Sequence, residues 1–445
     1  MIWQKILSKL NNLPKIALLL VLAQGLSSIG SSIASFSLDI WIYKTTGSYT
    51  SFALIAMISA LPNIIFSPLA GVIVDKFPKK KVLLACECYS LLGLFIVLIT
   101  LGLKQLNVKY IAAAVIILSS AETLRWPALS ATISMLTPIE HLARVNGLNE
   151  MNSGIASILG PLLGALTYIW PGVAIVIVLD AMTYVFCIFM LILITLPIVN
   201  LPGHLIKQSH FFDKILNIVK DCSFGFQWIY KQHELLNLLL LFVLINVSLS
   251  IFWVVYTPYL LSFTTTYALG KCFAAGGIGI LVSGLFFSAY GDLKHKVNGV
   301  LAGAILAGLC MVLFGILHAS FFMYLVAFFH GFAIPMMNIS NQTIWQIKVP
   351  TIYQGRVFSI RKMIALGINP IAIFLSIPLT TLIFKPIIDN SSNTYLKTLW
   401  GIGPTGAYGL MISSLGVLCI IVAIALLLIW KITQIVQLFD TSMAK

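Results

Sequence analysis

Long apolar stretches separated by short polar segments follow one another along the whole chain. Twelve windows hold enough apolar residues for an α-helix, which rises about 1.5 Å per residue, to cross a hydrocarbon core roughly 30 Å thick. The windows are residues 16–43, 51–74, 82–103, 110–136, 146–169, 173–199, 235–262, 272–290, 298–317, 321–347, 357–384 and 406–430. The pattern therefore predicts an all-α membrane protein with twelve transmembrane helices.

A more polar segment interrupts this pattern between the sixth and seventh windows. Apolar residues recur in it at helical spacing with lysines between them, which favours an amphipathic helix on the inner membrane surface over a binding site for a partner. We therefore expect an N-terminal six-helix bundle in residues 1–199, a cytoplasmic linker in residues 200–234 and a C-terminal six-helix bundle in residues 235–445.

Composition supports a membrane protein and argues against a soluble one. Of the 445 residues, 60% are hydrophobic and 9% are charged, whereas soluble domains carry about 25% charged residues. The net charge of +14 does not indicate nucleic-acid binding, because the basic residues lie between the apolar windows and not on one face. The seven cysteines form no C-x-x-C pair and are expected to be packing residues, and we expect no metal site.

The distribution of basic residues predicts the orientation in the membrane. If the N-terminus is cytoplasmic, the inner loops hold far more lysines and arginines than the outer loops. Basic residues accumulate on the cytoplasmic side of membrane proteins. Both termini are therefore predicted to be cytoplasmic.

A charged turn follows the second window. Gly71 lets a neighbouring helix approach closely, and Asp75 stands near a helix C-terminus, where an acid is unfavourable and needs a partner. A solvated loop acid is the alternative interpretation of Asp75. The basic residues of the turn are Lys76, Lys79, Lys80 and Lys81.

The run G71-x-x-x-D75-K76-x-x-K79-K80 resembles the loop signature between the second and third helices of the major facilitator superfamily, although Pro78 replaces a usual glycine. The resemblance implies two pseudo-symmetric six-helix bundles and a cytoplasmic gate in which Asp75 meets the start of the eleventh helix. The expected gate residues are Gly71, Asp75, Lys76, Lys79, Lys80, Glu87, Arg144, Asp292 and Arg356.

The fifth window contains Gly154, Gly160, Pro161 and Gly164. Glycines on one helix face permit close packing, and a proline bends a helix, so the residues alone predict a tightly packed, kinked helix. The pattern also resembles the fifth-helix motif of the exporting, proton-antiporting branches of the superfamily, although Ala165 replaces its last glycine. This resemblance favours export over import.

Further stretches resemble the macrolide-efflux-type drug antiporters of bacteria. They are D39-I-W-I-Y-K, R125-W-P-A-L-S-A, L179-D-A-M-T-Y and N341-Q-T-I-W-Q. The resemblance implies proton-coupled efflux of amphipathic organic compounds by alternating access, carried out by a monomer in the bacterial cytoplasmic membrane. We expect a small-molecule substrate and the lipid bilayer as partners, a proton gradient as energy source and no cofactor.

Four charged residues lie in or beside the apolar windows, where a buried ion costs at least about 2.5 kcal/mol. Glu122 and Arg125 are three residues apart and can pair on one helix face, either as part of a proton pathway or as a structural ion pair. Asp180 lies inside the sixth window. Asp39 is either a proton or cation site or a charge at the outer surface.

Polar and aromatic residues in the windows are candidates for lining a substrate cavity, with interhelical hydrogen bonds as the alternative. They are Asn146, Asn149, Asn338, Asn341, Gln342 and Trp345.

Other functions remain as alternatives. The same fold could export or import a siderophore or a small peptide. An intramembrane enzyme is disfavoured, because H-E-x-x-H and G-x-S-x-G are both absent, and so is a receptor without transport activity, because no soluble sensory domain stands out. ATP is not the expected energy source, because no Walker A motif occurs.

Overall fold

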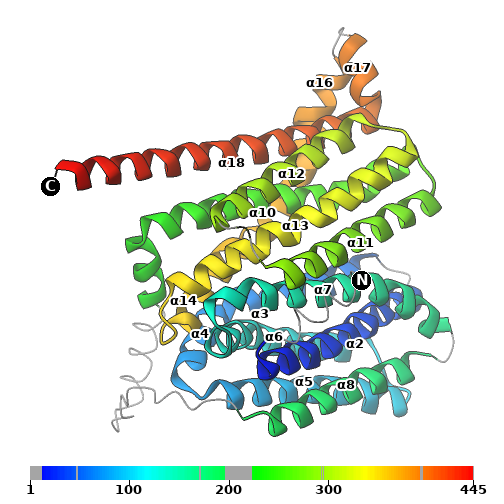
Figure 1. The fold of residues 1–445 in the computed structure, drawn as a ribbon. Helices are drawn as coiled ribbons and strands as arrows, with labels where there is room; N and C mark the ends of the chain where they lie inside the picture. Colours follow the sequence, from blue (N-terminus) through cyan, green and yellow to red (C-terminus); the bar gives the residue numbers. More distant parts are fainter. Residues whose placement is uncertain are drawn as a thin grey trace, which may run out of the picture. The chain divides into compact units, whose positions relative to one another are not determined.

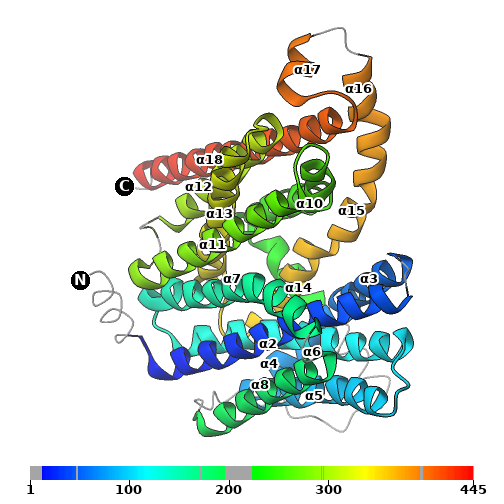
Figure 2. The ribbon, with the colours of Figure 1, turned by 90° about the vertical axis from the view of Figure 1, so that its right-hand side faces the viewer.

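The structure, a computed structural model, describes residues 13–46, 49–169, 172–195, 223–291, 293, 295–390 and 394–443. Every regular element in these ranges is helical, and they contain no β-strand. Figures 1 and 2 show the helices in two views at right angles. The predicted all-α fold is confirmed.

Six of the predicted windows fall in the first half of the chain, and a helix or a helix pair occupies each of them. The elements are α2 (Lys15–Thr46), α3 (Tyr49–Ile65), α4 (Ser67–Lys76), α5 (Lys79–Gly102), α6 (Val108–Leu136), α7 (Ile139–Ile169) and α8 (Val173–Leu193). Together α3 and α4 fill the second window, with a bend of 51° between them. Pro62 inside α3 and Pro68 at the start of α4 explain this break, because proline removes a backbone donor and favours a helix's first turn.

The other six windows are helical as well. The elements are α10 (His233–Leu261), α11 (Thr266–Tyr290), α12 (Lys296–Ile316), α13 (Ser320–Lys348), α14 (Gln354–Gly367), α15 (Asn369–Pro378), η1 (Leu379–Phe384), α16 (Lys385–Asp389), α17 (Thr394–Trp400) and α18 (Gly403–Met443). The predicted window 357–384 is divided into α14, α15 and the π-helical η1. Pro370 and Pro378, together with Pro386 in α16, cause this irregularity.

Nine helices within the described ranges are long and apolar enough to cross a membrane, or ten if α3 and α4 form one span. Helices α6 and α7 are not among these spans. A multi-pass membrane protein is confirmed, and the count of twelve spans stays a prediction.

The chain divides into two compact units. The first comprises residues 1–231, 284–291 and 342–363, and the second comprises 232–283, 292–341 and 364–445. The end of α11 and the segment from α13 into α14 thus belong to the first unit. Of the expected linker, residues 200–222 lie outside the described residues, and residues 223–231 are helical. The predicted boundaries of the two bundles stay a prediction.

Close packing in the first unit depends on the glycines of α7. A Cβ atom on Gly160 would lie 2.1 Å from Oγ of Ser32, and one on Gly164 would lie 3.0 Å from the backbone oxygen of Ile33. Ser32 and Ile33 belong to α2, so this face of α7 lies directly against α2. The tight packing predicted for this helix is therefore present, and Gly154 and Pro161 lie in the same helix.

Candidate functional site

Asp75, at the end of α4, binds the start of α14. Its carboxylate accepts hydrogen bonds from the backbone N–H groups of Gly355, at 2.7 Å, and Arg356, at 2.9 Å, and from Nε of Arg356, at 3.0 Å. Asp75 is 5% exposed. An acid is favourable here because the N-terminus of a helix carries a partial positive charge. We call Asp75, Gly355 and Arg356 the latch; Figure 1 shows α4 and α14 side by side.

Two glycines make the latch possible. A Cβ atom on Gly71 would lie 2.7 Å from Cα of Arg356, and one on Gly355 would lie 2.4 Å from Oδ1 of Asp75. Real Cβ atoms do not approach other atoms so closely, so α4 and α14 could not meet in this way with larger residues. The Arg356 guanidinium also lies 4.7 Å from the ring centre of Phe224, a favourable cation–π contact.

The other expected gate residues lie around the latch in different ways. Nζ of Lys79 is 4.0 Å from Asp75 and also donates to the backbone oxygen of Val74. Lys80 donates to the backbone oxygens of residues 192 and 194 at 3.0 and 2.7 Å, which fixes it to the end of α8. Lys76 is exposed at the end of α4. Asp292 lies outside the described residues.

Arg144, also expected at the gate, lies on α7 beside the end of α11. A Cβ atom on Gly291 would lie 3.6 Å from Nε of Arg144. The two helices approach closely through Gly147 and Gly284, whose backbones leave no room for a side chain at the contact. Arg144 therefore belongs to the contact of α7 with α11, apart from the Asp75 latch.

A second group of charges lies between α2, α5 and α6, in which Glu87 and Arg125 are buried and the Glu122 side chain is 49% exposed. Arg125 lies between two acids, with Nε 3.1 Å from Oε1 of Glu87 and Nη1 2.9 Å from Oε2 of Glu122. Its Nη2 donates to Oγ of Ser90 at 2.8 Å, and Gln24 donates to Glu87 at 3.0 Å. We call these five residues the charge cluster.

Glu87 therefore does not lie where the sequence placed it. We expected it at the cytoplasmic gate beside the lysines, but it pairs with Arg125 and is fully buried, with 0% exposure. The reason is helical geometry, because Glu87 lies about two turns beyond Lys79 on α5 and faces α2 and α6.

Polar contacts continue from the charge cluster to α8. The Arg125 guanidinium lies 5.2 Å from the ring centre of Tyr184. Oγ of Ser31 lies 2.9 Å from the Tyr184 hydroxyl and 3.0 Å from Oδ1 of Asp180. Asp180 is 2% exposed, and Glu87 and Arg125 are buried as well. These polar contacts therefore connect two buried acids and one arginine inside the first unit, and the more exposed Glu122 joins them through Arg125.

Asp39 does not belong to the series of polar contacts that connects the charge cluster to Asp180. It is half-buried on α2, eight residues beyond Ser31, which corresponds to roughly 12 Å along a helix. The structure thus joins Glu122, Arg125 and Asp180, but not Asp39.

A third polar region joins α7 to the end of α13. Nδ2 of Asn146 donates to Thr343 at 3.1 Å and to Gln346 at 2.7 Å, and Gln346 donates to the backbone oxygen of Ser130 at 3.2 Å. These residues are buried. Asn146 was a candidate for lining a substrate cavity, with an interhelical hydrogen bond as the alternative. The structure shows the interhelical hydrogen bonds.

Gln342 and Trp345 of α13 contact the basic start of α14. Arg361 donates to Oε1 of Gln342 at 2.8 Å, and its guanidinium lies 5.0 Å from the ring centre of Trp345. Lys362 lies 5.2 Å from the ring centre of Trp126 on α6. Asn149 is half-buried on α7, whereas Asn338 and Asn341 belong to the second unit.

Sequence reasoning missed Gln24, Trp126, Arg361 and Lys362. Arg361 and Lys362 lie within the predicted window 357–384, where a buried ion is costly, so the argument that singled out Glu122 and Arg125 also applies to them. Gln24 is a polar residue in the first window, and the same attention to polar residues in spans would have found it.

Comparison with known proteins identifies the family. The sequence profile described as Major Facilitator Superfamily matches residues 20–373, which is most of the chain. The chain is 26% identical over 366 residues to Macrolide efflux protein A of Streptococcus pyogenes, covering 79% of this chain and 86% of that protein. It is also 26% identical over 318 residues to Macrolide efflux protein A of Enterococcus faecalis, covering 68% and 93%.

A solved structure supports the fold. A bacterial homologue of the iron transporter ferroportin, crystallised in its outward-facing state, matches with a TM-score of 0.69. The match covers 92% of this chain and 99% of that one at 14% sequence identity, so it shows a shared fold alone. The chain therefore belongs to the Major Facilitator Superfamily and is a membrane transporter, not an enzyme.

Proposed function

We propose that this protein exports amphipathic organic compounds of the macrolide type across the bacterial cytoplasmic membrane in exchange for protons, by alternating access. The names of its relatives support the substrate class and the direction. The glycine and proline pattern of α7, which resembles that of exporting branches, also favours export. The observation that carries proton coupling is the sharing of Arg125 between Glu87 and Glu122.

Charge balance makes the charge cluster a candidate proton site. One arginine faces two carboxylates, and Oε2 of the fully buried Glu87 has no hydrogen-bond partner among the described residues. A buried carboxylate that is incompletely paired carries a large desolvation cost, which a bound proton removes. We infer that Glu87 takes up a proton in the transport cycle and that Arg125 then pairs more fully with Glu122.

Proton binding at Glu87 can alter helix packing because the cluster joins three helices. Gln24 is on α2, Glu87 on α5, and Arg125 on α6. Loss of the charge on Glu87 weakens its attraction to Arg125, so the three helices gain freedom to shift. A membrane potential of about 100 mV supplies roughly 2.3 kcal/mol per proton moved inward, and a pH gradient adds to this.

The latch supplies the second element of the proposed cycle. Access from the cytoplasm requires the start of α14 to leave Asp75, and three hydrogen bonds to this carboxylate oppose that step. A ligand or proton shifts such an equilibrium only by its different affinity for the two states. We propose that the latch stabilises the state that is closed to the cytoplasm.

Accumulation of a radiolabelled macrolide in cells tests the proposed function. Cells expressing the protein should accumulate less macrolide than cells with an empty vector, and a protonophore should abolish the difference. The Asp75→Asn variant should export more slowly at equal expression. If expression does not change macrolide accumulation, the macrolide-efflux proposal is wrong, and transport of a labelled ferric siderophore or small peptide becomes the function to test.

A further inference from the structure

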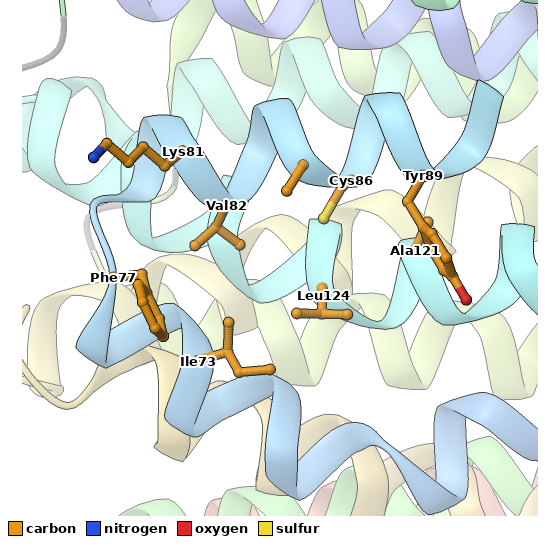
Figure 3. Close-up of a pocket in the computed structure, with 9 residues that line it drawn as sticks. Ile73, Phe77, Lys81, Val82, Cys86, Tyr89, Ala121 and Leu124 are labelled. Atoms are coloured by element: carbon orange, nitrogen blue, oxygen red, sulfur yellow. The ribbon is translucent and has the colours of Figure 1, made fainter. Parts of the chain in front are cut away.

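An apolar groove lies on the first unit between α4 and α5, with α6 as its floor (Figure 3). Its volume is about 500 Å³, within the range of roughly 300–1,000 Å³ that is typical of small-molecule sites. Figure 3 shows Lys81 at one end and Tyr89 at the other. Residues that line the groove between them include Ile73, Phe77, Ala85 and Leu124.

Lys81 is the one charged residue that lines the groove. Its neighbours Lys79 and Lys80 donate to backbone oxygens of residues 74, 192 and 194. Within the described residues, Lys81 has neither a hydrogen bond nor an ion pair, and it is exposed. The groove therefore combines an apolar channel with an uncompensated cation at one end.

The dimensions and charge of the groove fit one class of ligand. Residues 81 to 89 of α5 extend over about 12 Å, so a flexible hydrocarbon chain can lie along them. The predicted orientation places Lys81 at the cytoplasmic surface, where the inner leaflet carries anionic lipids that attract lysine. A cationic amphiphile would be repelled by Lys81. A zwitterionic phospholipid attracts Lys81 less than an anionic one, because its own cationic headgroup offsets the charge of its phosphate.

We propose that the groove binds an acyl chain of one anionic phospholipid from the cytoplasmic leaflet, with its phosphate at Lys81. Ile73 on α4 and Phe77 directly after it line the groove, two residues before and after Asp75. A bound chain therefore packs against the helix that carries the latch and restricts its movement. This inference goes beyond the proposed transport function and holds for any substrate.

Native mass spectrometry of the full-length protein, purified and exchanged into defined lipids, tests the inference. The probes are phosphatidylglycerol and phosphatidylcholine with identical acyl chains. The wild-type protein should retain one phosphatidylglycerol in preference to phosphatidylcholine. The Lys81→Ala variant should lose about fivefold in affinity for phosphatidylglycerol, as expected for one lysine near an anionic lipid surface.

Two further variants distinguish lipid binding in the groove from a general attraction of anionic lipids to lysines on the protein surface. Ala85 lines the groove and is exposed, so Ala85→Trp should fill the channel and displace the lipid while Lys81 is retained. Lys231 is an exposed lysine also predicted on the cytoplasmic side, so Lys231→Ala is the matched control and should bind as the wild type does. Equal losses in Lys81→Ala and Lys231→Ala, unchanged binding by Ala85→Trp, or no preference for phosphatidylglycerol would overturn the proposal.

Discussion

At the scale of single residues, Arg125 is the centre of the charges in the first unit. Its guanidinium contacts Glu87, Glu122 and Ser90, and it lies over the ring of Tyr184. Sequence spacing predicted that Glu122 and Arg125 can pair, because residues three apart share a helix face. It did not predict that Glu87 joins them, because which face of α5 meets α6 depends on packing between helices and not on local spacing.

Replacing Arg125 alone should therefore lower the stability of the protein more than replacing Arg125 and Glu87 together. In Arg125→Met, Glu87 remains buried without its cation, and such losses cost about 3–5 kcal/mol. The double variant Arg125→Met/Glu87→Gln should recover much of this stability, because neither charge then remains buried. Thermal unfolding of the purified protein, followed by fluorescence, measures both effects.

The control for this comparison is Lys109→Met, which removes an exposed lysine at the start of α6 and should leave the unfolding temperature nearly unchanged. If the double variant is no more stable than Arg125→Met, the unpaired carboxylate of Glu87 is not what destabilises Arg125→Met, and the predicted cost of leaving Glu87 without its cation is wrong.

At the scale of elements, α4 and α14 depend on each other through their glycines. The apolar windows predicted where the helices lie, since a span needs a continuous apolar run. The windows did not predict the bend between α3 and α4 or the division of the eleventh window, which follow from prolines within apolar runs. The contact of Asp75 with the start of the eleventh helix was expected only from a resemblance, because no local rule connects residues so distant in sequence.

Addition of one methyl group at Gly355 should open the latch. In Gly355→Ala the new Cβ atom would collide with Oδ1 of Asp75, so the start of α14 must move away from α4. Hydrogen exchange of the backbone amides at positions 355 and 356 should then accelerate by roughly tenfold or more, as expected when hydrogen bonds to a charged group are lost. Exchange measured by mass spectrometry on peptides spanning residues 350–360 reports this change.

Gly367→Ala is the matched control, because it adds the same methyl group at the other end of α14, where no atom lies within 4 Å. Asp75→Asn should accelerate exchange in the same peptides without any steric change. Wild-type exchange rates in both Gly355→Ala and Asp75→Asn would show that these amides are protected by something other than the latch.

At the scale of the whole molecule, the chain forms two compact units whose boundaries do not follow the order of the sequence. The end of α11 and residues 342–363 belong to the first unit, although they are far from it along the chain. Hydropathy cannot predict this assignment, because it identifies spans and not their partners. The latch, the charge cluster and the contacts of Asn146 all lie in the first unit, and each of them joins residues from more than one helix.

The proposal that this transporter is a proton-coupled exporter depends most directly on Glu87. The decisive measurement is macrolide uptake into inverted membrane vesicles under an imposed pH gradient, acid inside, for the wild-type protein and for Glu87→Gln at equal expression. We predict that the gradient drives uptake by the wild type and that Glu87→Gln, which carries no titratable group at this position, shows no acceleration by the gradient. Equal acceleration in both proteins would contradict a proton site at Glu87, and gradient-independent uptake by the wild type would contradict proton coupling itself.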